Sequence, residues 1–202
     1  MDKYTCWNIG GHDLEFLEDS HQYIVDGVCV PSITQIMKIK FGGKYEGIDK
    51  DTLKRASEAG TQMHETIQKW CEKGIDSDLV ELHNFKFLKA QYGFEVIENE
   101  TPVILSYDNE PMCAGRLDMV IMLRDQIGLA DLKRTSTLDK EYLAYQLNLY
   151  RIAYRQTYGI EADFLRGIHL REDIRKFVPI PVNEPMTWEF LKEYKESAHE
   201  KD

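Results

Sequence analysis

Two acidic residues and a lysine interrupt neighbouring apolar stretches in the middle of the chain. Asp118 lies in the run "RLDMVIML", and Asp131 and Lys133 flank Leu132 in "GLADLKRT". Alternate residues of an extended strand share a face, so the Asp131 carboxylate and the Lys133 ammonium should point to the same side. Charged side chains are seldom buried unless they are paired, which makes this group a candidate for chemistry.

The short connection between the two runs predicts how the acids meet. If Arg124 and Asp125 form a two-residue turn, the hairpin register places Asp118 opposite Asp131, with Cβ atoms about 5 Å apart. Facing carboxylates repel each other unless a cation lies between them. A divalent cation beside Lys133 would resolve the conflict. The alternative is an exposed sheet face that carries a chance pair of Asp and Lys.

Two expected helices add further polar residues. Gln146 and Tyr150 are four positions apart on a helix expected over 139–158, so they lie on one face, although core packing also explains Tyr150. Gly60 and His64 are one turn apart on a helix expected over 51–73. A single helical histidine is more often an ordinary surface or core residue than a ligand.

The remaining patterns predict an α/β (α+β) fold with a mixed central sheet flanked by helices. We expect one domain over 1–202, in which an N-terminal hairpin and helix precede a core and a last helix. Glycines should end three helices at positions 74, 93 and 159. The hairpin and first helix are expected at 13–40, with a turn near 19–20, and the last helix at 184–199. The core is expected at 51–182. Its helices should span 51–73, 77–92 and 139–158, and its strands 95–106, 112–123, 126–134, 163–171 and 176–182.

Composition indicates an ordinary globular chain. Hydrophobic residues make up 43% of the 202 residues, and four cysteines without C-x-x-C spacing fit a reducing compartment. With no signal peptide and no membrane-spanning run, we expect a cytoplasmic protein without membrane contact. The net charge of −10 is unusual for a nucleic-acid binder. Segment 111–176, however, has a slight excess of Lys and Arg, which removes this objection to a polyanionic substrate.

Taken together, these motifs resemble those of the PD-(D/E)XK nuclease superfamily, in particular its RecB-like exonuclease branch. That branch includes phage exonucleases and the mitochondrial genome maintenance exonuclease. The similarity spans most of residues 15–155, and it includes the thirteen-residue steps from Asp118 to Asp131 and from Lys133 to Gln146. The stretches that carry it are "GTQMH" (G-x-x-x-H), "ENETPV" (a strand glutamate), "AGRLD" (G-x-x-D), "DLK" ((D/E)-x-K), "YQLNLY" (Q-x-x-x-Y) and "VPSIT" (a "PSVT"-like element).

The resemblance implies phosphodiester hydrolysis that depends on Mg²⁺ or Mn²⁺. Asp118 and Asp131 would bind the ion together with the Leu132 backbone carbonyl. His64 and Glu100 would complete the site directly or through water. Oxygen-rich ligation suits Mg²⁺, and a histidine makes Mn²⁺ acceptable. No cysteine follows position 113, so the three C-terminal cysteines of the iron–sulfur-bearing relatives are lacking and no cluster is expected.

The same resemblance implies roles for the remaining residues. Lys133 would be the catalytic lysine, which orients the attacking water and stabilises charge on the phosphate. Gln146 and Tyr150 would support the site and the nucleic-acid backbone. Arg151 and Arg155 are one turn apart and are candidates for lining a groove or for solvated surface positions. The expected phosphate contacts are Arg134, Thr135, Ser136, Ser32 and Thr34, of which the last two also fit helix caps.

We therefore expect a DNA exonuclease that acts on free ends, in phage or prophage recombination and repair in a bacterial cytoplasm. A single-strand annealing or recombination protein is the expected partner. Three alternatives stay open: an endonuclease, a non-catalytic nucleic-acid-binding protein on the same fold, and a metal-binding module with no nucleic-acid role.

Overall fold

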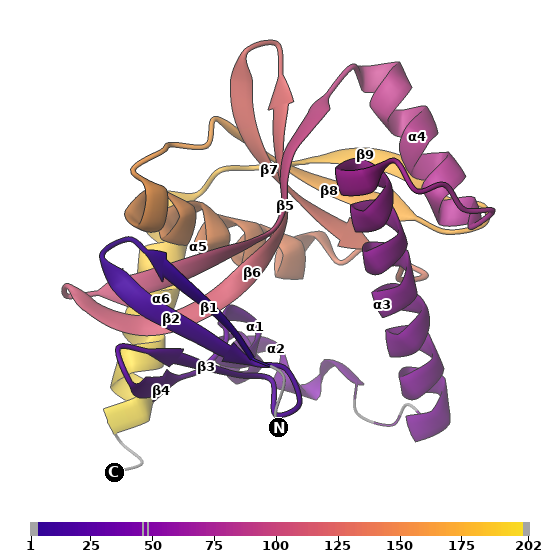
Figure 1. Ribbon diagram of the computed structural model, residues 1–202. Coiled ribbons are helices and arrows are strands. Elements are labelled where there is room, and N and C mark those ends of the chain that lie inside the picture. Colours follow the sequence, from indigo (N-terminus) through magenta and orange to yellow (C-terminus); the bar gives the residue numbers. More distant parts are fainter. Residues whose placement is uncertain (1–3, 46, 48, 200–202) are drawn as a thin grey trace.

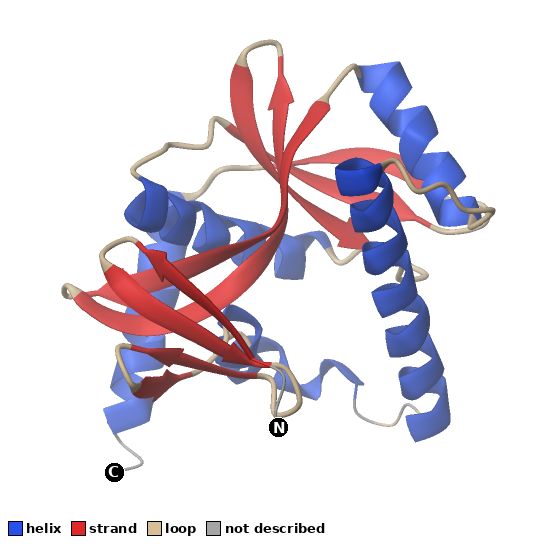
Figure 2. Cartoon of the chain, viewed as in Figure 1, coloured by secondary structure: helices blue, strands red, loops and turns tan. Residues whose placement is uncertain are grey.

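The computed structural model describes residues 4–45, 47 and 49–199, in which a larger β-sheet is flanked by helices and a smaller sheet lies beside one of its hairpins (Figures 1 and 2). The first sheet is a four-stranded antiparallel meander. The expected hairpin corresponds to its two inner strands, whereas the first strand was not predicted because none of its residues is fully buried. Its strands, in spatial order, are β1 (Tyr4–Ile9), β2 (His12–Leu17), β3 (Gln22–Val25) and β4 (Val28–Val30).

The second sheet has five strands in sequential order. Neighbouring strands are antiparallel except β7 and β8, which run parallel and are connected through helix α5 (Lys140–Tyr158). A parallel pair needs such a long crossover connection, whereas the antiparallel pairs are joined by short turns. Its strands are β5 (Glu95–Tyr107), β6 (Glu110–Leu123), β7 (Gln126–Lys133), β8 (Phe164–Leu170) and β9 (Arg175–Ile180).

The helix boundaries follow local signals in the sequence. Gly74, Gly93 and Gly159 adopt the left-handed conformation at the ends of three helices, as predicted. Asp139 caps α5 by accepting a hydrogen bond from the Tyr142 amide at 2.9 Å. The helix expected near residues 32–40 is divided at Met37 into two short helices. The other helices are α1 (Ile33–Ile36), α2 (Lys38–Phe41), a 3₁₀ turn (Gly42–Tyr45), α3 (Lys50–Lys73), α4 (Val80–Tyr92) and α6 (Glu184–His199).

The larger sheet is covered on both faces. Leu129 packs into a core with α1, α5 and α6, whereas its neighbour Ala130 packs into a second core with α3 and α4. The smaller sheet forms a third core against Ile104 and Ala114 of the β5–β6 hairpin. The structure thus has the expected mixed α/β class. Among the described helices, none is long and apolar enough to cross a membrane.

The hairpin that joins β6 to β7 has the predicted turn. Arg124 and Asp125 both adopt positive φ angles, 53° and 63°, as a type I′ turn requires. The strands pair from this turn as far as Met119 opposite Ala130, in the predicted register. The two acids singled out in the sequence are the next residue of each strand, so they lie where the pairing ends.

Glu100 interrupts the regular geometry of β5. Its φ angle is 50°, in the left-handed region that non-glycine residues seldom adopt. The residues on either side pair normally with Met119 and Leu117 of β6. Such strained residues cluster at functional sites, where the surrounding structure holds them in place.

Candidate metal centre and nucleic-acid groove

Three of the predicted metal ligands converge although they come from α3, β5 and β6. The ligand atoms of His64, Glu100 and Asp118 lie within 4.8 Å of one another. His64 Nδ1 is 3.6 Å from Asp118 Oδ1 and 3.9 Å from Glu100 Oε1. These distances are too long for hydrogen bonds, so the groups interact through their charges. All three side chains are partly exposed, which leaves the cluster accessible to a small ion.

The backbone of Leu132 orients two of these side chains. Its amide donates to Asp118 Oδ2 at 2.7 Å, and its carbonyl accepts from His64 Nε2 at 3.2 Å. A carbonyl can only accept, so Nε2 carries the hydrogen and Nδ1 faces the carboxylates. Metal-binding histidines are commonly oriented by this kind of hydrogen bond. One lone pair of the Leu132 carbonyl thus accepts from His64, so binding of a metal ion by this carbonyl, as predicted, has to use the second lone pair.

Asp131 and Lys133 form a close ion pair at the end of β7. Lys133 Nζ lies 2.6 Å from Asp131 Oδ2, and the lysine side chain is 22% exposed whereas that of the aspartate is 3% exposed. Burial raises the pKa of the Asp131 carboxyl despite Lys133, and the charge of Asp118 adds to the shift. Burial alone would lower the pKa of Lys133, but the two aspartates outweigh it, so the ammonium keeps its proton.

Three cationic side chains lie beside the three carboxylates. Burial disfavours the protonated form of His64, yet Asp118, Glu100 and Asp131 outweigh it and raise the pKa of this histidine from 6.5 to about 9. The imidazolium, the Lys133 ammonium and the Arg116 guanidinium, whose Nε lies 3.5 Å from Glu100 Oε2, thus act as counter-ions for these carboxylates. A divalent cation would do the same and release the histidine proton.

An unsatisfied oxygen supports the same fit. Gln146 Oε1 is buried and accepts no hydrogen bond in the described part of the chain, whereas the buried Asp131 Oδ2 has the Lys133 ammonium 2.6 Å away. Buried polar atoms normally have a partner, and each exception calls for an explanation. Carboxylate oxygens with one imidazole suit Mg²⁺ or Mn²⁺. The residues that would hold the ion are His64, Glu100 and Asp118, whereas Asp131 lies outside this 4.8 Å group and contacts Lys133 instead.

The two predicted α5 residues are both buried beside the site. Tyr150 is 6% exposed, and burial followed by the charge of Asp118 raises its pKa well above 10. A Cβ atom at Gly115 would lie 3.1 Å from the Tyr150 hydroxyl, so this position of β6 favours glycine. Gly115 belongs to the G-x-x-D motif, and this close approach is a physical reason for its glycine.

Two pockets meet at the site, and His64 and Gly60 line both. The smaller pocket, of about 480 Å³, is lined by the carboxylates of Glu18, Glu65 and Glu100 and by Arg116. We call it the acidic pocket. The larger one, of about 930 Å³, combines apolar residues and Asp139 with basic and hydroxyl-bearing side chains, and we call it the groove. Its polar lining includes Thr34, Lys133, Arg134, Thr135, Ser136, Gln146 and Arg171.

Most of the predicted phosphate contacts line the groove, but Ser32 does not. Its hydroxyl accepts from the Gln35 amide at 3.1 Å, and the Gln35 side chain accepts from the Ser32 amide at 2.7 Å. These two bonds form a capping box at the start of α1. Ser32 therefore has the structural role of a helix cap, and Thr34 is the residue of this segment that reaches the groove.

Two buried residues that the sequence analysis missed hold the loop after β7. Glu81 of α4 accepts a hydrogen bond from Arg134 Nε at 2.6 Å, and His169 of β8 binds the Thr135 carbonyl through Nε2 at 2.6 Å. Both side chains are almost completely buried. Neither lies in a recognisable motif, and their partners are distant in sequence, so no local signal could have found them.

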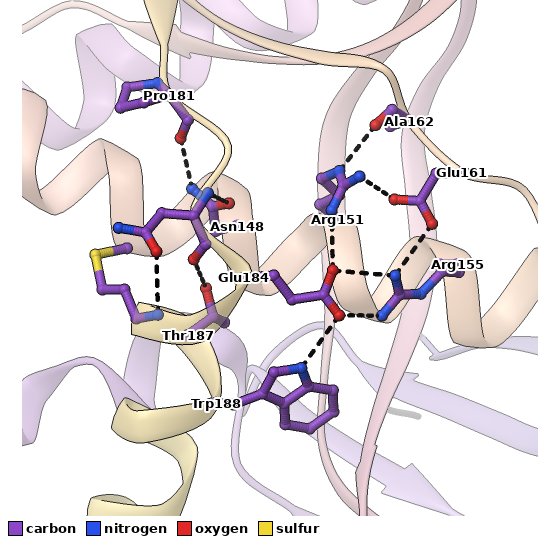
Figure 3. A network of polar contacts seen from close by, with 11 residues as sticks. Asn148, Arg151, Arg155, Glu161, Ala162, Pro181, Glu184, Thr187 and Trp188 are labelled. Atoms are coloured by element: carbon purple, nitrogen blue, oxygen red, sulfur yellow. Dashed lines mark hydrogen bonds and ion pairs between the residues drawn. The ribbon is translucent and has the colours of Figure 1, made fainter.

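Arg151 and Arg155 do not line either pocket. They form a network with Glu161 and Glu184 that joins α5 to the start of α6 (Figure 3). Arg155 Nη2 lies 2.6 Å from Glu184 Oε1, and Arg151 Nε also donates to the Ala162 carbonyl at 2.8 Å. The groove-lining alternative for these arginines is therefore wrong, because acidic partners occupy both guanidinium groups.

Comparison with known proteins does not assign the chain to a family. No protein-family profile and no curated protein matches it. Among solved structures, the crystal structure of SSO0001 is similar with a TM-score of 0.45 and 13% sequence identity, over 82% of this chain and 74% of that chain. A likeness at this level carries no argument about fold or function.

Proposed function

We propose that this protein is a nuclease that uses a divalent metal ion to hydrolyse phosphodiester bonds in DNA. The observation that carries the proposal is the convergence of His64, Glu100 and Asp118 beside the Asp131–Lys133 pair, at the head of a groove with basic and hydroxyl-bearing side chains. Resemblance to RecB-like nucleases supports the same function and favours free DNA ends as the substrate, in a phage-type recombination system with an annealing or recombination partner.

The residues of the site have distinct tasks in this reaction. His64, Glu100 and Asp118 would hold a Mg²⁺ or Mn²⁺ ion, which would supply polarisation of the scissile phosphate and a water molecule of lowered pKa. Lys133 presents its ammonium to the groove, where it orients the nucleophile and stabilises developing negative charge. Asp131 holds this ammonium in place through their ion pair.

Neighbouring groups complete the environment of the scissile phosphate. The Leu132 backbone keeps Asp118 and His64 in position. Gln146 lines the groove and has a free buried oxygen, which suits a contact with bound water or with the sugar–phosphate backbone. Arg134, Thr135 and Ser136 continue the groove beyond Lys133 and supply donors for the next phosphates.

A cleavage assay tests the proposal. End-labelled single-stranded, linear duplex and closed-circular DNA are incubated with Mg²⁺, Mn²⁺ or EDTA and with the wild type, Lys133→Ala or Lys192→Ala. The last variant is a control, because Lys192 is 67% exposed on α6 and its ion-pair partner is Glu196 of the same helix. We expect loss of linear DNA that depends on the metal, is abolished in Lys133→Ala and is unchanged in the control.

Other results lead to different conclusions. Cleavage of closed circles would make the protein an endonuclease. Wild-type activity in Lys133→Ala would contradict the mechanism. If no DNA is cleaved, the assay is repeated with single-stranded RNA, and if RNA also stays intact, binding without catalysis becomes the function to test.

A further inference from the structure

Two arginines line the groove, and they belong to loops that are distant in sequence. Arg134 follows β7 directly, and Arg171 follows β8. Strands β7 and β8 are parallel neighbours, so their carboxyl ends lie at the same edge of the sheet. The two arginines therefore reach one wall of the groove, close to Lys133.

One helix holds both arginine-bearing loops. Glu81 of α4 accepts a hydrogen bond from the Arg134 side chain at 2.6 Å, and Asn84 Nδ2 donates to the backbone carbonyl of Arg171 at 2.7 Å. Glu81 and Asn84 are three positions apart and thus share a face of α4. The same helix face therefore determines where both arginines stand.

The Glu81–Arg134 pair is asymmetric. The side chain of Glu81 is 2% exposed, whereas that of Arg134 is 27% exposed and lines the groove. The hydrogen bond uses Nε, so the two Nη groups are not needed by Glu81. Among the residues that the structure describes, no other acidic group pairs with Arg134, and the Arg171 side chain has no acidic partner at all. The ion pair therefore leaves guanidinium donors of Arg134 at the groove.

Arginine suits this position because its planar group binds phosphate oxygens through two parallel hydrogen bonds. A guanidinium that is held by a buried carboxylate loses little side-chain entropy when it binds, so it is already oriented for the ligand. The neighbouring loop is equally constrained, because buried His169 holds the carbonyl of Thr135.

We propose that Arg134 and Arg171 form a clamp for backbone phosphates of the substrate strand, and that Glu81 and Asn84 of α4 are its positioning residues. The proposal rests on the proposed nuclease function and adds the residues that fix the strand beyond Lys133. Binding by the clamp is independent of base sequence, because all of its contacts are to phosphate.

Binding in the absence of metal tests the clamp separately from cleavage. The anisotropy of a fluorescein-labelled single-stranded oligonucleotide is measured in EDTA over a series of salt concentrations. The proteins are the wild type, Arg134→Ala, Arg171→Ala, Glu81→Gln and Arg175→Ala. The last is a matched control, because Arg175 stacks on Phe87 at 3.8 Å from the ring centroid and does not line the groove.

We expect Arg134→Ala and Arg171→Ala each to weaken binding about tenfold and to reduce the salt slope by about 0.7, the value for one phosphate contact on a single strand. Arg175→Ala should bind like the wild type. In steady-state cleavage of linear DNA, Glu81→Gln should raise KM several-fold and leave kcat within about twofold, because it disturbs the clamp and not the metal centre.

A coupling experiment separates positioning from a structural role. Glu81→Gln combined with Arg134→Ala should bind no more weakly than Arg134→Ala alone, since Glu81 acts through that arginine. If Arg171→Ala and Arg134→Ala match Arg175→Ala while the wild type still cleaves DNA, the clamp is wrong and the nuclease function stands. If the wild type neither binds nor cleaves nucleic acid, both proposals are wrong. Arg171→Ala is a groove-surface change, so it keeps the test decisive even if Glu81→Gln does not fold.

Discussion

The protein contains two clusters of charged side chains that differ in how well they are satisfied. In the Arg151–Arg155–Glu161–Glu184 network, two arginines face two glutamates, and Glu184 also accepts from Trp188 Nε1 at 3.2 Å (Figure 3). At the candidate metal centre, by contrast, the cationic nitrogens of His64 and Arg116 lie 3.5 to 3.9 Å from the carboxylates of Asp118 and Glu100, and these contacts are not hydrogen bonds.

The pKa values of the two clusters shift in opposite directions. Hydrogen bonds from Arg155 lower the pKa of Glu184 from 4.5 to about 2, whereas burial raises the pKa of Asp131. Lowered acid pKa values mean that the charged form is stabilised by the fold, and raised values mean that it is destabilised. The first cluster therefore stabilises the fold, whereas Asp131 carries a cost of burial, to which the charge of Asp118 adds and which a nearby cation offsets.

The largest expected effect is on catalysis, and it should separate the two clusters. Lys133→Ala should reduce cleavage at least about 100-fold, because the loss of one transition-state donor has an effect of this size. Arg151→Ala should reduce the rate per folded molecule by less than about twofold. The measurement is initial cleavage rate normalised to the folded fraction from circular dichroism. Equal losses in both variants would remove the distinction between the clusters.

The free energy of unfolding should be affected more by changes in the Arg–Glu network than by changes at the candidate metal centre. Glu184→Gln removes the negative charge and one of the two acceptor oxygens that pair with two arginines, so it should lower the free energy of unfolding by about 1–2 kcal/mol, after discounting for solvent screening. Urea unfolding followed by circular dichroism measures this change. Lys192→Ala is the control, with an expected change below about 0.5 kcal/mol. A Glu184→Gln protein as stable as the wild type would show that the network is only a surface arrangement.

Removing a carboxylate from the candidate metal centre should raise the free energy of unfolding, whereas Glu184→Gln lowers it. Asp118→Asn keeps an oxygen acceptor for the Leu132 amide but removes one negative charge, so in EDTA it should raise stability by about 1 kcal/mol. Added Mn²⁺ should raise the Tm of the wild type, because the ion binds the folded state, and should raise that of Asp118→Asn much less. Thermal unfolding with and without Mn²⁺ tests both expectations. An equal Mn²⁺ response in both proteins would place the metal elsewhere.

The smallest expected effect is the pH dependence of the Glu184 network. The pKa of Glu184 is lower in the folded protein than its usual value of 4.5, so its contribution is complete above about pH 4.5 and is lost as the pH falls towards 2. The difference in unfolding free energy between wild type and Glu184→Gln should therefore shrink over this window. Urea unfolding at several pH values measures it. A difference that is independent of pH would mean that charge is not the cause.

Local rules predicted most of the elements that carry the site. The Arg124–Asp125 turn, the register that follows it and the glycine-terminated helices all depend on residues that are near in sequence. The first strand of the smaller sheet was missed because its side chains show no buried face. The sequence pattern predicted one short helix in the segment around Met37, whereas the structure has two short helices divided at this residue.

The motifs predicted that His64, Asp118 and Lys133 belong to the candidate site, because each motif places its residue on a defined face of a helix or strand. The left-handed conformation of Glu100 was not predictable, because it arises from the packing of β5 on β6. The same holds for Glu81 and His169, whose partners lie in other elements. The pairing of Arg151 with Glu184 was also not predictable, because the two residues are 33 positions apart and no local pattern connects them.

By itself, the sequence determined the α/β class, the β6–β7 register and the set of acids and bases that can meet at one edge of a sheet, since these follow from periodicity, turn chemistry and motif spacing. The tertiary structure decided how closely each charge is paired, because the partners come from elements that are distant in sequence. Arg155 lies 2.6 Å from Glu184, whereas His64 and Arg116 lie 3.5 to 3.9 Å from Asp118 and Glu100, the group of acids at which we propose that a metal ion binds.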